Sequence, residues 1–204
     1  MTPTRAAACA RWHRAGGAAR GRPATGLVAG LVLVSMVKVT DYTVITCMLS
    51  PEVQNSAVQS VLCWLATVDG NGQPNVSPKE IFTVFDTEHL VIANIASPTS
   101  VRNIEINPLV CVSFIDVFVQ KGFKVAGTAR NVPRQDAEFS RWAAPLKAKA
   151  GPRFPIHRVL VVRATAIDAI LAPSYRLYAA ETTEHSQVAS PMRAYGVQPE
   201  RGDA

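Results

Sequence analysis

A tight hairpin is the feature that most limits what this chain can fold into. Residues 61–68 are apolar and rich in β-branched side chains, and the sequence DGNG follows directly at 69–72. Gly and Asn tolerate the positive φ that short hairpin turns require. The chain is therefore predicted to reverse here and to run back as a second strand over residues 74–85.

Four further segments have the length and composition of strands, and few helical segments separate them. These four segments are residues 89–94, 109–118, 123–132 and 158–171. Long crossover connections, which parallel strands need, are absent between most of them. The spacing predicts a mainly β fold with short helices, in which six antiparallel strands form a small barrel or sandwich.

Helices are expected at a few places around these strands. Ser50, Pro51 and Glu52 form a typical helix start, which predicts a helix to about residue 60. Residues 135–149 place apolar side chains at helical spacing, although Pro145 is expected to kink or split that helix. The segment from residue 173 onward is expected to be partly helical.

The positive charge of the chain is concentrated in its first 47 residues. The formal net charge of the 204 residues is +6. Six basic residues and one acidic residue lie before Met48: Arg5, Arg11, Arg14, Arg20, Arg22 and Lys38 against Asp41. The body from residue 48 is nearly neutral, so its charge does not indicate a nucleic-acid partner.

Residues 1–47 permit three interpretations. The composition changes abruptly at Met48, which favours a translation start there. A basic, acid-poor segment followed by an apolar run at 27–37 also fits a targeting leader, and with it an exported or membrane-attached form. A functional tail is the third interpretation. The run is too short to span a bilayer, and no membrane contact is expected for residues 48–204. The sequence predicts a domain over 48–199 and a short tail over 200–204.

The cysteines indicate neither a disulfide framework nor a metal site. Cys9, Cys47, Cys63 and Cys111 are far apart, and no Cys or His lies at metal-ligand spacing from them. Free thiols in apolar segments are typical of a reducing compartment. A cytoplasmic location is therefore expected for the body of the protein.

A possible anion site follows the third predicted strand. Ser97 is placed to cap a helix and Pro98 to occupy its first position. Hydroxyl groups at Thr99 and Ser100, with Arg102 just beyond, fit a phosphate bound at a helix N-terminus. An ordinary helix cap with a solvated arginine remains the alternative.

Two further polar groups lie beside predicted strands. Lys79 follows Pro78 on the return strand of the hairpin, where a proline indicates an edge or a bulge. It is either an isolated surface charge or a ligand for an anion. Gln120 and Lys121 form a third polar cluster at a turn between strands.

Together these segments resemble the pyridoxamine 5'-phosphate oxidase-like branch of the FMN-binding split-barrel superfamily. The resemblance is carried by WLATVDGNGQPNVSPKEIF at 64–82, LVIANIASPTSVRNIEINPLVCVSF at 90–114 and FKVAGTARNV at 123–132. It covers nearly all of the body and none of residues 1–47.

The resemblance implies a six-stranded antiparallel split β-barrel that forms a homodimer with two FMN molecules at the subunit interface. It implies phosphate contacts from the second strand and from the segment after the third. It also implies contacts with the flavin ring from the backbone at residues 80–81 and from the next hairpin. The residues carried over are Lys79, Glu80, Ile81, Asn94, Ser97, Ser100, Arg102, Asn103, Gln120 and Lys121.

The departures from the family leave the reaction open. Thr99 and Ser100 stand where pyridoxamine-phosphate oxidases usually have Arg-Lys. Those enzymes also end with a Trp followed by an Arg that help hold flavin and substrate, whereas the last tryptophan here is Trp142. Oxidation of pyridoxamine phosphate is therefore in doubt, and no catalytic residue is assigned, because a flavin exchanges hydride without one. An FMN-dependent oxidoreductase acting on a small redox substrate is expected. The alternatives are a non-catalytic flavin-binding or stress-related module and a deazaflavin-dependent reductase.

Overall fold

The computed structural model describes residues 49–152 and 154–198. The predictions for residues 1–47 and 200–204, and for Cys9 and Cys47, lie outside the described residues. Within them, no helix is long and apolar enough to cross a membrane.

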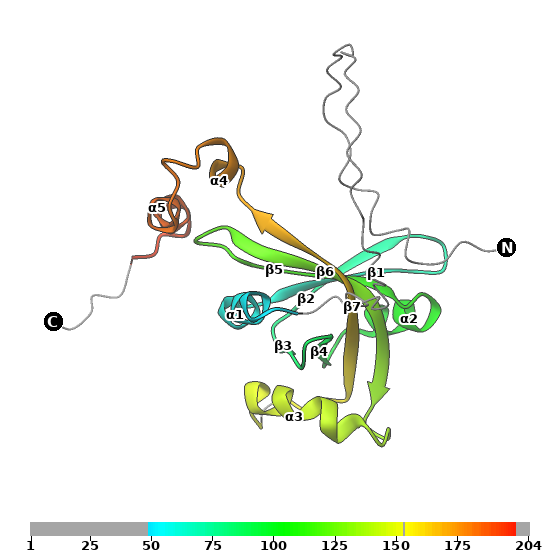
Figure 1. Cartoon of the computed structure of the whole chain (residues 1–204). Helices are drawn as coiled ribbons and strands as arrows, with labels where there is room; N and C mark the ends of the chain where they lie inside the picture. The colour runs from blue at the N-terminus through cyan, green and yellow to red at the C-terminus, as the bar shows by residue number, and fades with distance from the viewer. Residues whose placement is uncertain (1–48, 153, 199–204) are drawn as a thin grey trace, which may run out of the picture. The chain divides into compact units, whose positions relative to one another are not determined.

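One antiparallel sheet dominates the structure (Figure 1). Its strands follow one another in the order β2-β1-β5-β6-β7-β4-β3. Their bounds are β1 Cys63–Val68, β2 Pro74–Lys79, β3 Phe82–Val84, β4 His89–Asn94, β5 Leu109–Asp116, β6 Lys121–Pro133 and β7 Arg158–Leu171. The mainly β prediction is confirmed, and the curled sheet agrees with a split barrel.

The predicted count of six strands is wrong, because the described residues form seven. The segment expected as one strand over 74–85 breaks at Glu80 and Ile81 into β2 and β3. β2 and β3 are the two edge strands of the sheet, yet only these two residues join them. One straight strand cannot pair with β1 and with β4 at opposite edges, so the chain bends here and the sheet curls until its edges approach.

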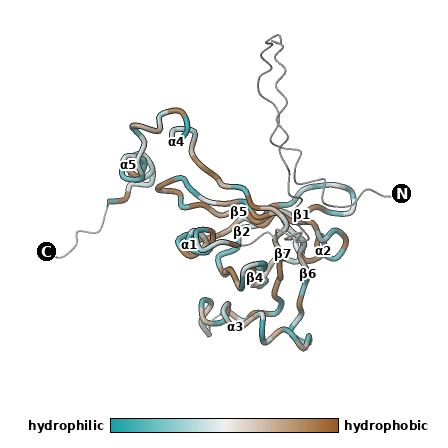
Figure 2. The backbone as a smooth tube through the Cα atoms, viewed as in Figure 1, coloured by the Kyte–Doolittle hydropathy of each residue, from teal (hydrophilic) through white to brown (hydrophobic). Residues whose placement is uncertain are grey.

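Two clusters of buried side chains fill the fold. The larger cluster lies inside the curl of the sheet and includes Leu65, Phe82 and Phe114. The smaller one lies between β4, β7 and the helix Phe139–Ala150 (α3), with Trp142 as its largest member. Strand β4 is buried on both faces because each cluster covers one of them. Figure 2 shows the apolar segments gathered in the strands of the sheet.

The helices agree with the sequence in place and differ in detail. They are α1 Pro51–Gln59, α2 Pro98–Ile106, α3 Phe139–Ala150, α4 Ser174–Leu177 and α5 Glu184–Tyr195. Ser50 caps α1 as expected, because its hydroxyl accepts a hydrogen bond from the Val53 amide at 3.4 Å. Helix α3 begins four residues later than predicted, and Pro145 does not split it.

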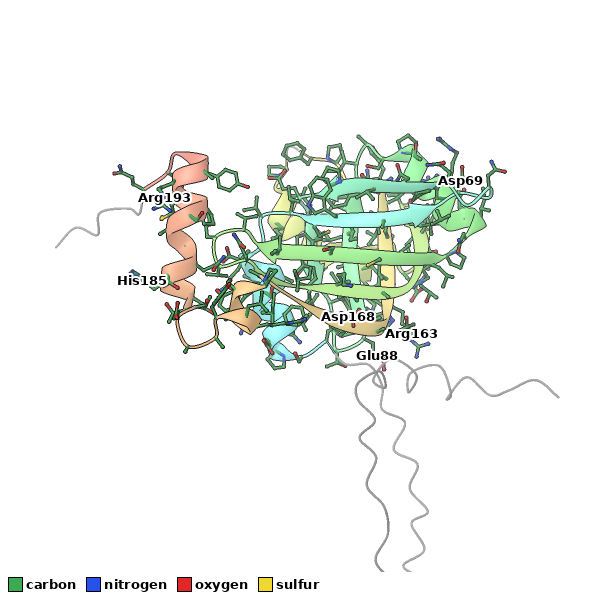
Figure 3. All side chains as sticks on the ribbon, turned by 90° about the horizontal axis from the view of Figure 1, so that it is seen from above. Asp69, Glu88, Arg163, Asp168, His185 and Arg193 are labelled. Carbon is green, nitrogen blue, oxygen red and sulfur yellow. The ribbon has the colours of Figure 1, made fainter. Side chains whose placement is uncertain are left out.

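Helix α5 lies to one side of the sheet and carries His185 and Arg193 (Figure 3). Asp69, in the β1–β2 hairpin turn, lies at the other end of the sheet (Figure 3). The aspartate accepts hydrogen bonds from the amides of Asn71 and Gln73 at 2.8 and 2.9 Å, which closes the predicted turn.

Candidate functional site

Lys79 is the last residue of β2 and lies immediately before the break in the edge strand. Its side chain is only 6% exposed. The ammonium Nζ donates to the Ser77 hydroxyl at 2.7 Å and also to the Ser97 hydroxyl. The two hydroxyl oxygens lie 3.3 Å apart. We call Lys79, Ser77 and Ser97 the cradle.

Ser97 occupies the N-cap position of α2 but does not cap it. Its side chain makes no hydrogen bond to the first turn of the helix, although Pro98 occupies the expected first position. The expectation of a side-chain cap is therefore wrong. The Ser97 hydroxyl instead accepts a hydrogen bond from Lys79. The amides of the first turn of α2 consequently keep their capacity to bind an anion.

The cradle holds a buried cation without a counterion. No carboxylate among the described residues forms an ion pair with Lys79, and burial lowers the pKa of its ammonium group. Cys63, directly opposite on β1, supplies no negative charge, since burial raises the pKa of its thiol to about 12. A buried charge without a partner is unfavourable. An anion bound at the cradle would remove that penalty.

A cavity of 540 Å³ opens beside the cradle. Lys79 and Ser97 line it, and so do Glu80 and Ile81 at the break in the edge strand. Much of the remaining wall is apolar and includes Phe154. The cavity thus combines a cationic, hydroxyl-lined part with apolar walls, as ligand sites for amphipathic molecules do.

Two buried polar atoms close to the cradle in sequence lack a hydrogen-bond partner among the described residues. These are Asn94 Oδ1, at the end of β4, and Ser100 Oγ, in the first turn of α2. Buried polar groups are normally hydrogen-bonded, so both atoms have unused hydrogen-bonding capacity, although neither residue lines the cavity beside the cradle. The donor set of one ammonium group, hydroxyl groups and helix amides fits a phosphate group.

Arg102 and Asn103 point to other partners. The Arg102 guanidinium is exposed and donates to the Thr99 hydroxyl at 3.1 Å. The Asn103 amide is buried and donates to the Thr67 hydroxyl at 3.1 Å. Neither Arg102 nor Asn103 lines the cavity beside the cradle.

Gln120 and Lys121 lie at a second, separate position. Gln120 has a φ of 55° in the turn before β6. The Lys121 ammonium lies 2.7 Å from the Glu184 carboxylate of α5 and 4.7 Å from the centre of the Tyr175 ring. Glu184 raises the pKa of Lys121. Within one chain, the structure does not bring this pair to the cradle: the cavity that Lys121 lines shares only Gln59 with the cavity beside the cradle.

Sequence reasoning missed Ser77 and Lys149 as neighbours of the site. Ser77 lies two residues before Lys79 on the same strand, so the period of two would have placed both on one face. Lys149 lines the cavity and donates to the Phe82 carbonyl at 3.0 Å. No local signal connects it with β3, from which 67 residues separate it.

In the described part of the chain, no group of His, Cys, Asp and Glu side chains is arranged to hold a metal ion. Cys63 and Cys111 are free thiols.

The family model described as pyridoxamine 5'-phosphate oxidase matches residues 49–171. The match covers more than half of the chain and contains the cradle, the break in the edge strand and the Gln120–Lys121 turn. The chain belongs to the pyridoxamine 5'-phosphate oxidase family, as its sequence resemblance had indicated.

Solved structures agree with this fold. HupZ from Group A Streptococcus is 25% identical with a TM-score of 0.52, and the match covers 59% of this chain and 92% of HupZ. A putative pyridoxamine 5'-phosphate oxidase from Lactobacillus delbrueckii is 27% identical with a TM-score of 0.51, covering 61% and 97%. An FMN-binding protein from Syntrophomonas wolfei is 16% identical with a TM-score of 0.50, covering 59% and 88%. A comparison with curated proteins gave no match.

Proposed function

We propose that this chain is a flavoprotein that binds FMN, with the flavin phosphate at the cradle. The observation that carries the proposal is the buried Lys79, which is held between two hydroxyl groups and has no carboxylate partner among the described residues. The family match supports it, and the Syntrophomonas wolfei protein of the same fold is described as FMN-binding.

The residues of the site take distinct roles in this proposal. Lys79 and Ser97 bind the phosphate, and the unpartnered Ser100 hydroxyl donates to the same group. Asn94 Oδ1 accepts from a hydroxyl of the ligand. The backbone of Glu80 and Ile81 borders the flavin ring at the bend, where the Ile81 carbonyl already accepts a hydrogen bond from the Ala93 amide at 2.9 Å. Bound FMN supplies hydride or electron transfer, while the protein supplies binding and orientation.

The same proposal includes a homodimer. The outer face of β2, β1 and β5 is apolar and open: Trp64 is 45% exposed, Val76 58% and Leu109 63%. These side chains share one face because Trp64 pairs with Pro78 and Ala66 with Val76. We define this outer sheet face by Trp64, Ala66, Val76, Pro78, Leu109 and Cys111. Exposed apolar faces of this kind are typical of interfaces.

A second copy gives the Gln120–Lys121 turn a role. Within one chain the turn lies apart from the cradle, as the two separate cavities show. In the proposed dimer, the turn of one copy contacts the flavin ring bound by the other. A cation there stabilises the reduced, anionic flavin. This role for Lys121 requires the dimer.

The favoured activity is turnover of a small redox substrate. The favoured location is the cytoplasm, where the free thiols Cys63 and Cys111 remain reduced. A non-catalytic flavin-binding module is the second candidate. It is favoured by the segment after residue 171, which holds no tryptophan.

The test is titration of the apoprotein with FMN, riboflavin and a deazaflavin, followed by stopped-flow mixing with NADH and NADPH. We expect FMN to bind more tightly than riboflavin and a reduced nicotinamide to bleach the bound flavin. Tight binding without reduction by any donor in a broad panel would favour the non-catalytic module. Tighter binding of the deazaflavin than of FMN would show that the cofactor is a deazaflavin and not FMN. Binding of none of the three would refute the proposal.

A further inference from the structure

Thr67 is a buried polar centre that joins two elements of the site. It lies on β1 and is 1% exposed. Its hydroxyl oxygen accepts hydrogen bonds from the side-chain amides of Asn75 and Asn103, both at 3.1 Å. One hydroxyl thus accepts from two amides of different elements, 8 and 36 residues away along the chain.

The two elements joined by Thr67 are those that carry the cradle. Asn75 lies on β2, two residues before Ser77. Asn103 lies on α2, whose N-cap residue is Ser97. The hydrogen bonds to Thr67 therefore fix the position of α2 against the hairpin at one end, while the contact of Lys79 with Ser97 joins the same two elements at the other.

Apart from Asn103, α2 contacts the sheet through apolar side chains and through one exposed hydrogen bond, from the Asn131 amide to Glu105 at 3.2 Å. Val101 and Ile104 are buried, and Ile106 is exposed. Apolar packing is not directional, so it permits small shifts of the helix along its axis. A buried hydrogen bond depends on both distance and angle, and therefore fixes the register of the helix.

The hydrogen bond to Thr67 also changes the role of Asn103. The family resemblance places Asn103 among the residues that contact FMN. In this chain its amide donates to Thr67, and the residue does not line the cavity beside the cradle. Asn103 therefore acts on the ligand through the position of α2.

We propose that Thr67 and Asn103 are positioning residues, which hold Ser97 and the first turn of α2 at the distance from Lys79 that a phosphate group requires. This inference rests on the proposed function, since it assumes that a phosphate binds at the cradle. It predicts that the Thr67 hydroxyl contributes to the affinity for the phosphate and leaves the affinity for the rest of the flavin unchanged.

The experiment compares FMN with riboflavin, which lacks the phosphate, by quenching of flavin fluorescence. Thr67→Val keeps the shape of the side chain and removes the acceptor. It breaks the hydrogen bonds from both Asn75 and Asn103, of which the second positions α2. We expect FMN binding to weaken roughly tenfold, the effect of losing that one positioning hydrogen bond, and riboflavin binding to stay unchanged. Thr67→Ser keeps the hydroxyl and should restore the ratio of the two affinities. Thr165→Val is the matched control, because it removes a hydroxyl that bonds to the Ala126 carbonyl on another part of the sheet.

A second variant, Asn103→Leu, tests the same hydrogen bond if Thr67→Val does not fold. Asn103→Leu removes the donor from the other side of the same hydrogen bond, and it should lower the ratio by a similar factor. The double variant should bind FMN no more weakly than the more affected single variant, because both changes break the same hydrogen bond between Thr67 and Asn103.

The outcomes separate the two proposals. If wild-type protein prefers FMN and Thr67→Val and Asn103→Leu keep that preference, the positioning role is wrong and the cradle stands. If Thr67→Val weakens FMN and riboflavin by the same factor, the role of Thr67 is only structural and the inference is overturned. If wild-type protein binds FMN and riboflavin equally, the phosphate site at the cradle is itself refuted.

Discussion

Lys79 donates a hydrogen bond to Ser97 across 18 residues of sequence, from the edge strand β2 to the N-cap of α2. This contact brings a cation, two hydroxyl groups and a helix N-terminus to one place beside a cavity of 540 Å³. Because the Ser97 hydroxyl contacts Lys79, it does not cap α2, although Ser97 occupies the N-cap position.

Replacing Lys79 should lower the affinity for FMN without lowering the stability of the apoprotein. Lys79→Met keeps an apolar stem of similar length and removes a buried charge that has no counterion among the described residues. We expect FMN affinity to fall about 100-fold, as for the loss of a charge-assisted contact to phosphate. The apoprotein should be at least as stable as wild type. Fluorescence titration and thermal unfolding measure the two effects.

The matched control is Lys147→Met, since Lys147 is exposed on α3 and does not line the cavity beside the cradle. It should change neither FMN affinity nor stability by much. Equal losses of FMN affinity in the two variants would contradict a specific role for Lys79.

The pH dependence of apoprotein stability should show the buried ammonium group. Burial lowers the pKa of Lys79 in the folded state below its ordinary 10.5. Between the two pKa values the unfolded chain binds more protons, so the Lys79 contribution to the free energy of unfolding rises with pH and is least favourable below the folded pKa. We therefore expect the stability difference between Lys79→Met and wild type to shrink as the pH rises from neutral towards the ordinary lysine pKa of 10.5.

Chemical denaturation of both proteins across that range measures this difference. The ionisation of Cys63 in the unfolded state occurs in both proteins and largely cancels. A difference that stays constant with pH would show that Lys79 titrates normally in the folded protein.

A charge on the outer sheet face should disrupt the proposed dimer. Val76→Lys places an ammonium group on the β2 part of that face, which we expect to be buried on dimerisation. Light scattering after gel filtration should show a dimer for wild type and a monomer for the variant, together with weaker flavin binding. Ile106→Lys is the control, because Ile106 is 65% exposed on α2 and lies outside the outer sheet face. A wild-type protein that elutes as a monomer would contradict the shared flavin site.

Gly122 is expected to be intolerant of any side chain. It pairs with Ile115 between β5 and β6, and a Cβ at this position would lie 2.1 Å from the Phe114 carbonyl oxygen. Because the obstruction is backbone, Gly122→Ala should cost about 3 kcal/mol or more in the free energy of unfolding. Gly70→Ala is the matched change, since its Cβ would meet only the Ile106 side chain at 3.4 Å. Denaturant titration should find Gly70→Ala close to wild type; comparable losses would contradict the packing argument.

The sequence allowed prediction of those features that depend on neighbouring residues. The DGNG turn, the cap of α1 by Ser50 and the buried face of α3 follow from local conformational preferences and periodicity. The family resemblance predicts Lys79 and Ser97 as site residues, and the structure places the two side chains in contact.

Features that depend on distant contacts could not be predicted in this way. The break at Glu80 and Ile81 arises because the chain moves from one edge of the sheet to the other, which no local pattern records. The sequence predicts that Ser97 caps α2, but its hydroxyl accepts a hydrogen bond from Lys79 and makes none to the helix. The hydrogen bond that Asn103 donates to Thr67, 36 residues earlier, also has no local sequence signal.

The visible absorption spectrum of the purified protein is the clearest test of whether this chain binds FMN. We predict a yellow protein with the two absorption bands of an oxidised flavin, and release of FMN, identified by mass, at one molecule per chain. A colourless protein that takes up no FMN on reconstitution would contradict the account.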